Sequence, residues 1–236
     1  MNLIYHSQSS AAGEAGQAVE IGLDDAETLH VLHPDQLVAY QGPPAGRQDS
    51  LFDLPGLLRK KKLIRTRLTG PGRLWLALPP GFHLTSLPVG ECEDLLFEYR
   101  NVLYYTEGIG MKTVWQQAKR SLLTRELVKM KFDGTGTIGL LTSGPLVPIA
   151  LDPQTPLFAD AGSLVAFPEN ARVELAVYGN HLASQHMRYQ WKLTGRGYAL
   201  LQAGRIDRRF EREFEQDGLL KRVLREVVPF GGVWFR

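Results

Sequence analysis

The sequence has little cysteine, no long apolar run and no basic leader. Its 236 residues include one cysteine, Cys92, which excludes a disulfide within the chain and a cysteine-based zinc site. No apolar run approaches the roughly 20 residues of a membrane-spanning helix. The first residues, Met1 to His6, lack the basic and apolar regions of a signal peptide. These absences predict a soluble protein in the reducing cytoplasm.

Sequence signatures of catalysis are also missing. There is no P-loop and no Gly-x-Ser-x-Gly nucleophile elbow. Cys92 is flanked by acids, which disfavour a reactive thiolate. The pairs His30/His33 and His181/His186 are three and five residues apart and could join a metal site if carboxylates completed it. His30 and His33, however, fall in an expected strand and turn, where residues three apart point to opposite faces. We therefore expect no catalytic residue, no cofactor, no metal ligand and no enzymatic activity.

The composition is that of a folded, turn-rich protein. Hydrophobic residues make up 44% and charged residues 22%, which is typical of globular chains. The 24 glycines and 14 prolines add up to 38 of 236 residues, about 16%, against roughly 12% in average proteins. The excess predicts many turns and short strands.

A pattern of short motifs occurs three times along the chain. A Gly-x-Gly motif supplies the six glycines Gly70, Gly72, Gly134, Gly136, Gly195 and Gly197, with spacings of 64 and 61 residues. An apolar run precedes each copy, at Leu37–Tyr40, Val102–Tyr105 and Leu164–Phe167, and a further glycine follows at Gly81, Gly144 and Gly204. Such phased recurrence indicates three tandem units.

Each unit is predicted to be built from strands. Apolar and polar residues alternate in Ile64–Leu68, Val128–Phe132 and Tyr189–Leu193, as in half-buried strands. Another apolar strand follows each Gly-x-Gly, whereas a dinucleotide site requires a helix there. We therefore interpret the six glycines as hairpin glycines that supply positive φ angles. The preceding apolar runs are expected to be strands buried on both faces.

Helical spacing is confined to three segments. Thr113 to Glu126 and Ser50 to Leu58 are expected to be short helices in the connections, and Arg208 to Val228 a broken helix near the C-terminus. The expected class is all-β: three tandem pseudo-symmetric units in a compact β-sandwich or β-helix-like body. Within this one compact domain we expect an acidic lead at 1–27, β units at 28–90, 91–153 and 154–205, and an extension at 206–236.

The phased motifs resemble those of the altered inheritance of mitochondria protein 24 family. The resemblance covers about residues 28 to 205 and is clearest from Phe132 to Phe167. It implies a fold like that of the tryptophan RNA-binding attenuation protein, with a trimeric assembly and no catalytic residues to transfer. The apolar end of the chain, Val227 to Phe235, is expected to pack as a strand, either on its own subunit or on a neighbouring one.

Charge is distributed unevenly. Residues 1–50 hold seven acids and one base, which gives −6, so the other 186 residues carry +8 of the total +2. Corresponding strand positions are basic, and they form a candidate surface for a partner or an anion: Arg65, Arg67, Lys129, Lys131 and Lys192. The alternative is that these are merely the solvated side of the strands.

Two functions remain open from the sequence. The favoured one is a non-enzymatic oligomeric interaction or scaffold protein, most simply a homotrimer with an unknown protein partner. The alternative is binding of RNA or another polyanion, by analogy of fold. Tyr189 and Trp191 alternate away from Lys192, so we expect no specific nucleic acid recognition and only weak association with polyanions or membrane surfaces.

Overall fold

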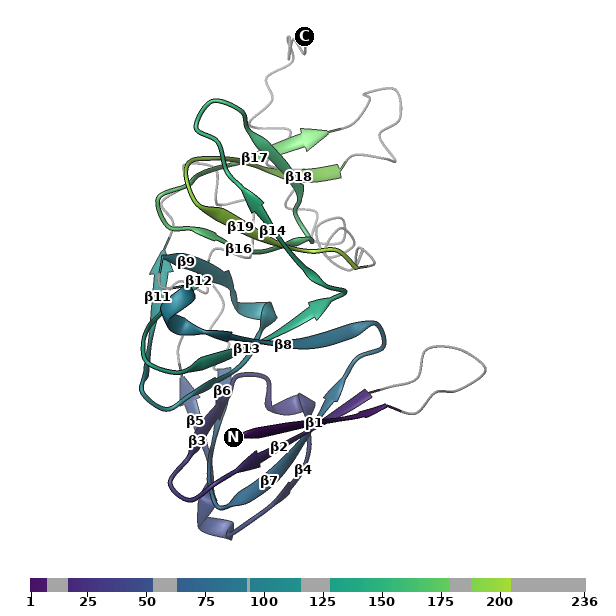
Figure 1. Ribbon diagram of the computed structural model, residues 1–236, viewed down its shortest axis with the longest axis vertical. Coiled ribbons are helices and arrows are strands. Elements are labelled where there is room, and N and C mark those ends of the chain that lie inside the picture. Colours follow the sequence, from purple (N-terminus) through teal and green to yellow (C-terminus); the bar gives the residue numbers. More distant parts are fainter. Residues whose placement is uncertain (8–16, 53–62, 93, 116–127, 179–187, 205–236) are drawn as a thin grey trace.

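The computed structural model is a stack of antiparallel β-sheets, and it describes residues 1–7, 17–52, 63–92, 94–115, 128–178 and 188–204 (Figure 1). Sheet A has the strand order β1 (Asn2–Ser7), β2 (Gln17–Leu23), β7 (Gly72–Leu78) and β4 (Leu37–Gln41). Sheet B has the order β5 (Arg47–Phe52), β6 (Leu63–Thr69), β3 (Thr28–Val31), β10 (Val102–Thr106), β13 (Thr137–Ser143) and β8 (Phe82–Pro88).

The other two sheets complete the stack. Sheet C has the order β11 (Ile109–Trp115), β12 (Val128–Gly134), β9 (Leu95–Glu98), β16 (Leu164–Pro168), β19 (Tyr198–Gln202) and β14 (Leu146–Ala150). Sheet D has the order β15 (Leu157–Asp160), β18 (Arg188–Thr194) and β17 (Arg172–Tyr178). Short 3-10 helices lie in the connections: η1 (Pro34–Gln36), η2 (Pro44–Gly46), η3 (Val89–Glu91) and η4 (Tyr99–Asn101).

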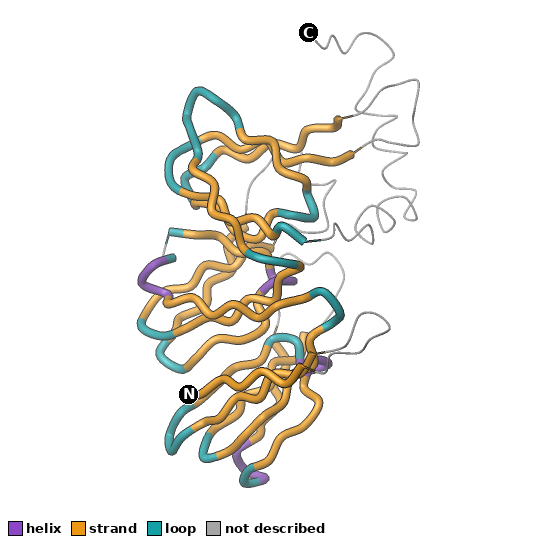
Figure 2. The backbone as a smooth tube through the Cα atoms, turned by 45° about the vertical axis from the view of Figure 1, so that its right-hand side comes forward, coloured by secondary structure: helices purple, strands orange, loops and turns teal. Residues whose placement is uncertain are grey.

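Three apolar cores lie between successive sheets. In each, alternating strand residues of two facing sheets pack together, as strand periodicity requires. The first joins sheets A and B around Leu74 and Leu103, and the second joins B and C around Tyr105 and Phe132. The third joins C and D around Phe167. The layers follow the long axis, with the N-terminal strands at one end and sheet D at the other (Figure 2).

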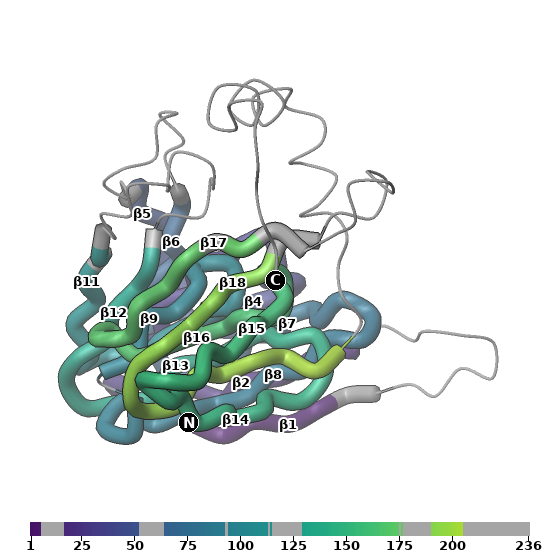
Figure 3. Tube along the Cα trace, turned by 90° about the horizontal axis from the view of Figure 1, so that it is seen from above, coloured from purple at the N-terminus to yellow at the C-terminus, as the bar shows by residue number. Residues whose placement is uncertain are grey.

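Sheets B and C have the same order of strands. Each strand of sheet C stands six places later in the chain than its counterpart in sheet B. In both, two half-sheets of three strands meet at the centre, through β3–β10 in sheet B and β9–β16 in sheet C. The view along the stack shows strands of successive layers lying over one another (Figure 3). The all-β prediction is thus confirmed, and the expected strands within 64–68, 128–132 and 189–193 are β6, β12 and β18.

The six predicted hairpin glycines lie at corners between sheets rather than in hairpins. The strands that flank each Gly-x-Gly belong to different sheets: β6 and β7 to B and A, β12 and β13 to C and B, and β18 and β19 to D and C. Positive φ angles occur at Gly134, Gly136, Gly195 and Gly197, but not at Gly70 and Gly72. A Cβ at Gly70 would overlap the backbone of Asp24, so close packing requires glycine there.

The helix predictions are wrong where the structure tests them. Residues 50–52 belong to β5 and residues 113–115 to β11, because these segments extend a strand that is already paired with its neighbour. The remaining residues of both segments lie outside the described part of the chain, as do Arg208 to Val228 and the apolar end. The acidic lead contains two strands, β1 and β2, which the sequence reading did not anticipate.

The expectation of full burial fails for one apolar run. The runs in β10 and β16 are buried, with Leu103 and Val165 fully inaccessible. In β4 the corresponding residue, Val38, is 66% exposed. The reason is the position of the strand in the stack: sheet A covers Leu103 on β10 and sheet B covers Val165 on β16, whereas sheet A is the end sheet and the corresponding face of β4 is open.

We predict that Gly134→Val lowers the free energy of unfolding by about 1–3 kcal/mol, because its φ of +102° is strained for a β-branched residue. An added Cβ would also overlap the carbonyl oxygen of Gly108. The matched control is Gly90→Val, since nothing lies near a Cβ at Gly90. Equal denaturant midpoints for the two variants would contradict this explanation.

Candidate functional site: the basic positions and the open sheet edges

The first two basic positions, Arg65 and Arg67 on β6, contact residues of and beside β10. Arg65 donates from Nη1 to the hydroxyl of Tyr105 at 2.8 Å, and burial raises the pKa of that hydroxyl. Arg67 Nη2 lies 3.8 Å from Glu107 Oε2. Both arginines therefore link the two half-sheets that meet in sheet B.

Lys129 on β12 is buried rather than displayed. Its side chain is 5% exposed and forms an ion pair with Glu98, which is 2% exposed. The ammonium also lies 5.7 Å from the ring centroid of Phe167 and 6.0 Å from that of Trp191, within the range of a cation–π contact. The sequence pattern correctly placed Lys129 on the polar side of its strand, but sheet D covers that side.

Lys131 and Lys192 are paired with acids near the surface. Lys131 Nζ lies 2.5 Å from Glu169 Oε2, and this hydrogen bond raises the pKa of the lysine. Lys192 Nζ lies 3.3 Å from Glu174 Oε2. Hydrogen bonds from Arg172 and then Lys192 lower the pKa of Glu174. All five basic positions thus have an acid or an aromatic ring as neighbour.

The pairings follow a rule that the sequence spacing could have revealed. Glu107 and Glu169 each stand five residues after the start of an apolar run, at Val102 and Leu164. Each receives the basic residue of the preceding unit, Arg67 or Lys131. Arg65, Arg67 and Lys131 therefore tie neighbouring half-sheets together.

The candidate metal ligands are not brought together. His30 stacks on Tyr105 at 4.7 Å, with Nε2 3.1 Å from Glu107, whereas His33 Nε2 lies 3.2 Å from the carbonyl oxygen of Tyr99. Burial lowers the pKa of both histidines. Within the described ranges, no three His, Cys, Asp or Glu residues cluster as a metal site. Cys92 is buried with Sγ 3.3 Å from the Pro88 carbonyl, and His181 and His186 lie outside those ranges.

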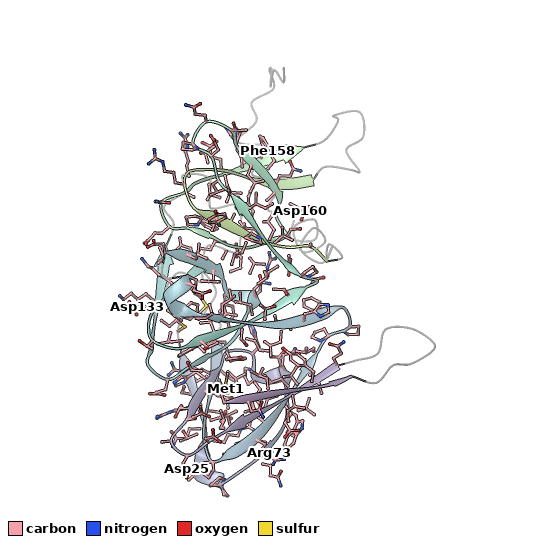
Figure 4. The ribbon with its side chains drawn as sticks, in the orientation of Figure 1. Met1, Asp25, Arg73, Asp133, Phe158 and Asp160 are labelled. Carbon is pink, nitrogen blue, oxygen red and sulfur yellow. The ribbon has the colours of Figure 1, made fainter. Side chains whose placement is uncertain are left out.

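At the position where sheets B and C join two half-sheets, sheets A and D each leave a described strand with one unpaired edge, at opposite ends of the stack. Among the described strands, β4 pairs only with β7, and β15 pairs only with β18. Their counterparts β10, β16, β3 and β9 each pair on both sides. Large apolar side chains accompany both edges: Val38 on β4 is 66% exposed, and Phe158 on β15 is 52% exposed. Figure 4 shows Phe158 and Asp160 in the terminal unit, far from Arg73 on sheet A.

Sequence reasoning missed these edges. The apolar run in β4 is visible in the sequence, but whether a neighbouring strand covers it depends on strand order, which local alternation does not encode.

No helix within the described residues is long and apolar enough to cross a membrane.

We predict that Lys129→Met lowers the free energy of unfolding by about 3–5 kcal/mol, because it leaves the Glu98 carboxylate buried without its partner. Combining it with Glu98→Leu should restore much of the loss. Lys131→Met is the matched control, since its ion pair is solvated, and it should have a much smaller effect in the same denaturant titration. An equal loss from both lysine variants would refute the buried-pair explanation.

Comparison with solved structures supports the fold. The crystal structure of protein SPYM3_0169 from Streptococcus pyogenes superimposes with a TM-score of 0.55 at 16% identity, covering 94% of this chain and 100% of the other. No curated protein matches the sequence. The model of the family described as mitochondrial biogenesis AIM24 matches residues 9–204, which include all three Gly-x-Gly motifs. The chain therefore belongs to the mitochondrial biogenesis AIM24 family.

Proposed function

We propose that this protein is a non-enzymatic scaffold that acts by assembling with copies of itself. The observation that carries the proposal is the pair of incomplete sheets at the two ends of the stack. Sheets B and C each contain six strands, formed by two half-sheets of three. Sheet A contains only the half that corresponds to β8-β13-β10, with β1 added, and sheet D only the half that corresponds to β3-β6-β5.

The exposed edge of β4 favours association because it lacks the usual protection. Natural edge strands carry charges or prolines that prevent pairing with other chains. Of the outer edge strands of the four sheets, β5, β8, β11, β14 and β17 each contain a proline or a charged residue, whereas β1 of sheet A, with the sequence Asn-Leu-Ile-Tyr-His-Ser, contains neither a proline nor an acidic, lysine or arginine residue. β4, with the sequence Leu-Val-Ala-Tyr-Gln, contains neither. On β15 the only charge is Asp160 at its end, where Oδ1 accepts a hydrogen bond from the Gly162 amide.

Exposed apolar side chains at the two ends of the stack also favour association between copies. Val38 corresponds to Leu103 and Val165, both of which are fully buried by a neighbouring sheet. Burying a valine or phenylalanine side chain contributes about 1.5–3 kcal/mol. A second copy placed against each end would bury these side chains and would pair the free backbone groups at the same time.

Binding of RNA or another polyanion is less well supported. The chain carries a net charge of only +2. Acids or aromatic rings already engage the five repeated basic positions. Any attraction would be weak and would fall steeply with salt, because it depends on counterion release. RNA binding that is sequence-selective and persists at physiological salt would favour this alternative over the scaffold.

We predict that the native chain sediments as an oligomer at micromolar concentration, with the trimer, three times 26.4 kDa, as the expected size. Val38→Lys combined with Phe158→Lys should shift it to the monomer, because two charges would be buried in the contacts. Leu51→Lys is the control: Leu51 is also exposed, at 61%, but lies on the lateral edge strand β5. A native monomer would overturn the proposal.

A further inference from the structure

We infer that β4 of one copy pairs antiparallel with β15 of the next copy, so that sheets A and D of neighbouring copies form a third six-stranded sheet. The inference deepens the proposed scaffold function and rests on it. The joined order β2-β7-β4-β15-β18-β17 reproduces the orders β8-β13-β10-β3-β6-β5 and β14-β19-β16-β9-β12-β11 of sheets B and C. A second copy of this chain is thus the occupant that fits both edges at once.

The register of this contact follows from the two joins inside the chain. In sheet B, Tyr104 lies opposite Val31, and in sheet C, Ala166 lies opposite Phe97. The equivalent residues on the open edges of β4 and β15 are identified from the residues with which each strand pairs on its opposite edge. Ala39, Tyr104 and Ala166 pair with residues 75, 139 and 200, whereas Val31, Phe97 and Ala159 pair with residues 66, 130 and 191.

Both series of partners advance by 64 and then 61 residues, as the Gly-x-Gly motifs do. The correspondence therefore places Ala39 opposite Ala159 of the next copy. One position along, Tyr40 lies opposite Phe158, and Gln41 lies opposite Leu157. This register uses all of the strand-forming residues of β15 that precede Asp160.

Side chains at this register are compatible. Ala39 and Ala159 are both small, so the backbones can approach without a clash. Tyr40 and Phe158 stand where Tyr105 and His30 stand in sheet B, and those two rings stack at 4.7 Å. Aromatic pairs across strands stabilise a sheet by roughly 0.2–1 kcal/mol relative to alanine pairs.

The bulge in β4 does not prevent pairing. Its register shifts between Leu37 and Ala39 on the side facing β7. The same shift occurs in β10 between Val102 and Tyr104, and in β16 between Leu164 and Ala166. Both of those strands still pair on their other side, with β3 and β9. A strand with this bulge therefore accepts a neighbour.

The contact between copies differs from the internal joins in its charge. Across the internal joins, Glu107 pairs with Arg67 in sheet B and Glu169 pairs with Lys131 in sheet C. The corresponding residue after β4 is Gly42, which has no carboxylate, and Lys192 is paired with Glu174 of its own sheet. The contact between copies is therefore mainly apolar and backbone-mediated, and it should persist as salt rises.

The contact is heterologous, because it joins two different edges. Contacts of this kind close into rings when the rotation between copies permits, and otherwise they build filaments. Pairing of β4 with β4 would instead give a two-fold dimer and would leave β15 open.

Cysteine cross-linking tests the register. In sheet B, hydrogen bonds from Leu32 N to Leu103 O at 2.9 Å and from Glu107 N to Thr28 O at 3.0 Å make Tyr104/Val31 a non-hydrogen-bonded pair. Such pairs have Cα atoms about 4.5 Å apart, within the range that a disulfide spans. Ala39→Cys/Ala159→Cys should therefore form intermolecular disulfides under mild oxidation, seen as cross-linked species on a non-reducing gel.

Controls separate the outcomes. Gln41→Cys/Leu157→Cys tests the same register at a second site, in case a cysteine at the buried Ala159 impairs folding. Gln41→Cys/Ala159→Cys is two residues out of register and should cross-link at least tenfold more slowly. The native chain has only the buried Cys92 and should not cross-link.

Each unfavourable result has a defined meaning. Efficient cross-linking of Ala39→Cys alone would show β4–β4 pairing and would overturn the inference. An oligomer in which neither in-register pair cross-links would also overturn it while leaving the scaffold function standing. Sedimentation of the native chain as a monomer would overturn both the inferred contact and the proposed scaffold function.

Discussion

Continuity of the sheets is the constraint on which the rest of the structure depends. Each layer is made of two half-sheets contributed by different parts of the chain, and their backbones join through β3–β10 and β9–β16. Each unit consequently shares one sheet with the next, and the cores between layers follow from that sharing. A chain built in this way has unfinished halves at its two ends, unless the ends meet each other or another copy.

Polar residues strengthen the internal joins. Arg65 reaches the Tyr105 hydroxyl, and Lys129 is buried with Glu98 beneath aromatic rings. Buried ion pairs add little net stability compared with apolar residues, but losing one partner is costly. Lys129 and Glu98 lie opposite each other on β12 and β9, so the pair penalises any arrangement in which these two strands of sheet C separate while they stay buried. Arg65, Arg67 and Lys131, three of the basic positions that suggest an anion surface in the sequence, also contribute to the joining of the units.

The sequence predicts the strands well and their partners poorly. Alternation in residues 64–68, 128–132 and 189–193 located three strands, because one face of each is apolar. The same alternation occurs in β2, with Val19, Ile21 and Leu23 inward, but the predominance of acids in this segment masks it. The Gly-x-Gly motifs predict hairpins, because the sequence of a turn between two strands does not reveal whether the strands pair or face each other across a core.

Besides the pairing partner of each strand, the sequence does not predict which side chains are buried. Val38 and Val165 occupy the same place in their motifs, yet one is exposed and the other fully buried. Lys129 and Lys131 occupy alternate polar positions, but only Lys129 is covered by the next sheet. In both cases the difference arises from whether a neighbouring layer extends over that residue, which depends on how the whole stack is arranged.

Amide hydrogen exchange measured as a function of protein concentration tests the central claim most directly. The contact between copies would use the amides of Tyr40 and Phe158, which correspond to those of a hydrogen-bonded pair in sheet B. Our account predicts that both amides become protected as concentration rises, while amides on the free side of the lateral edge strand β5 do not. Exchange at Tyr40 and Phe158 that is equally fast at every concentration would contradict the account.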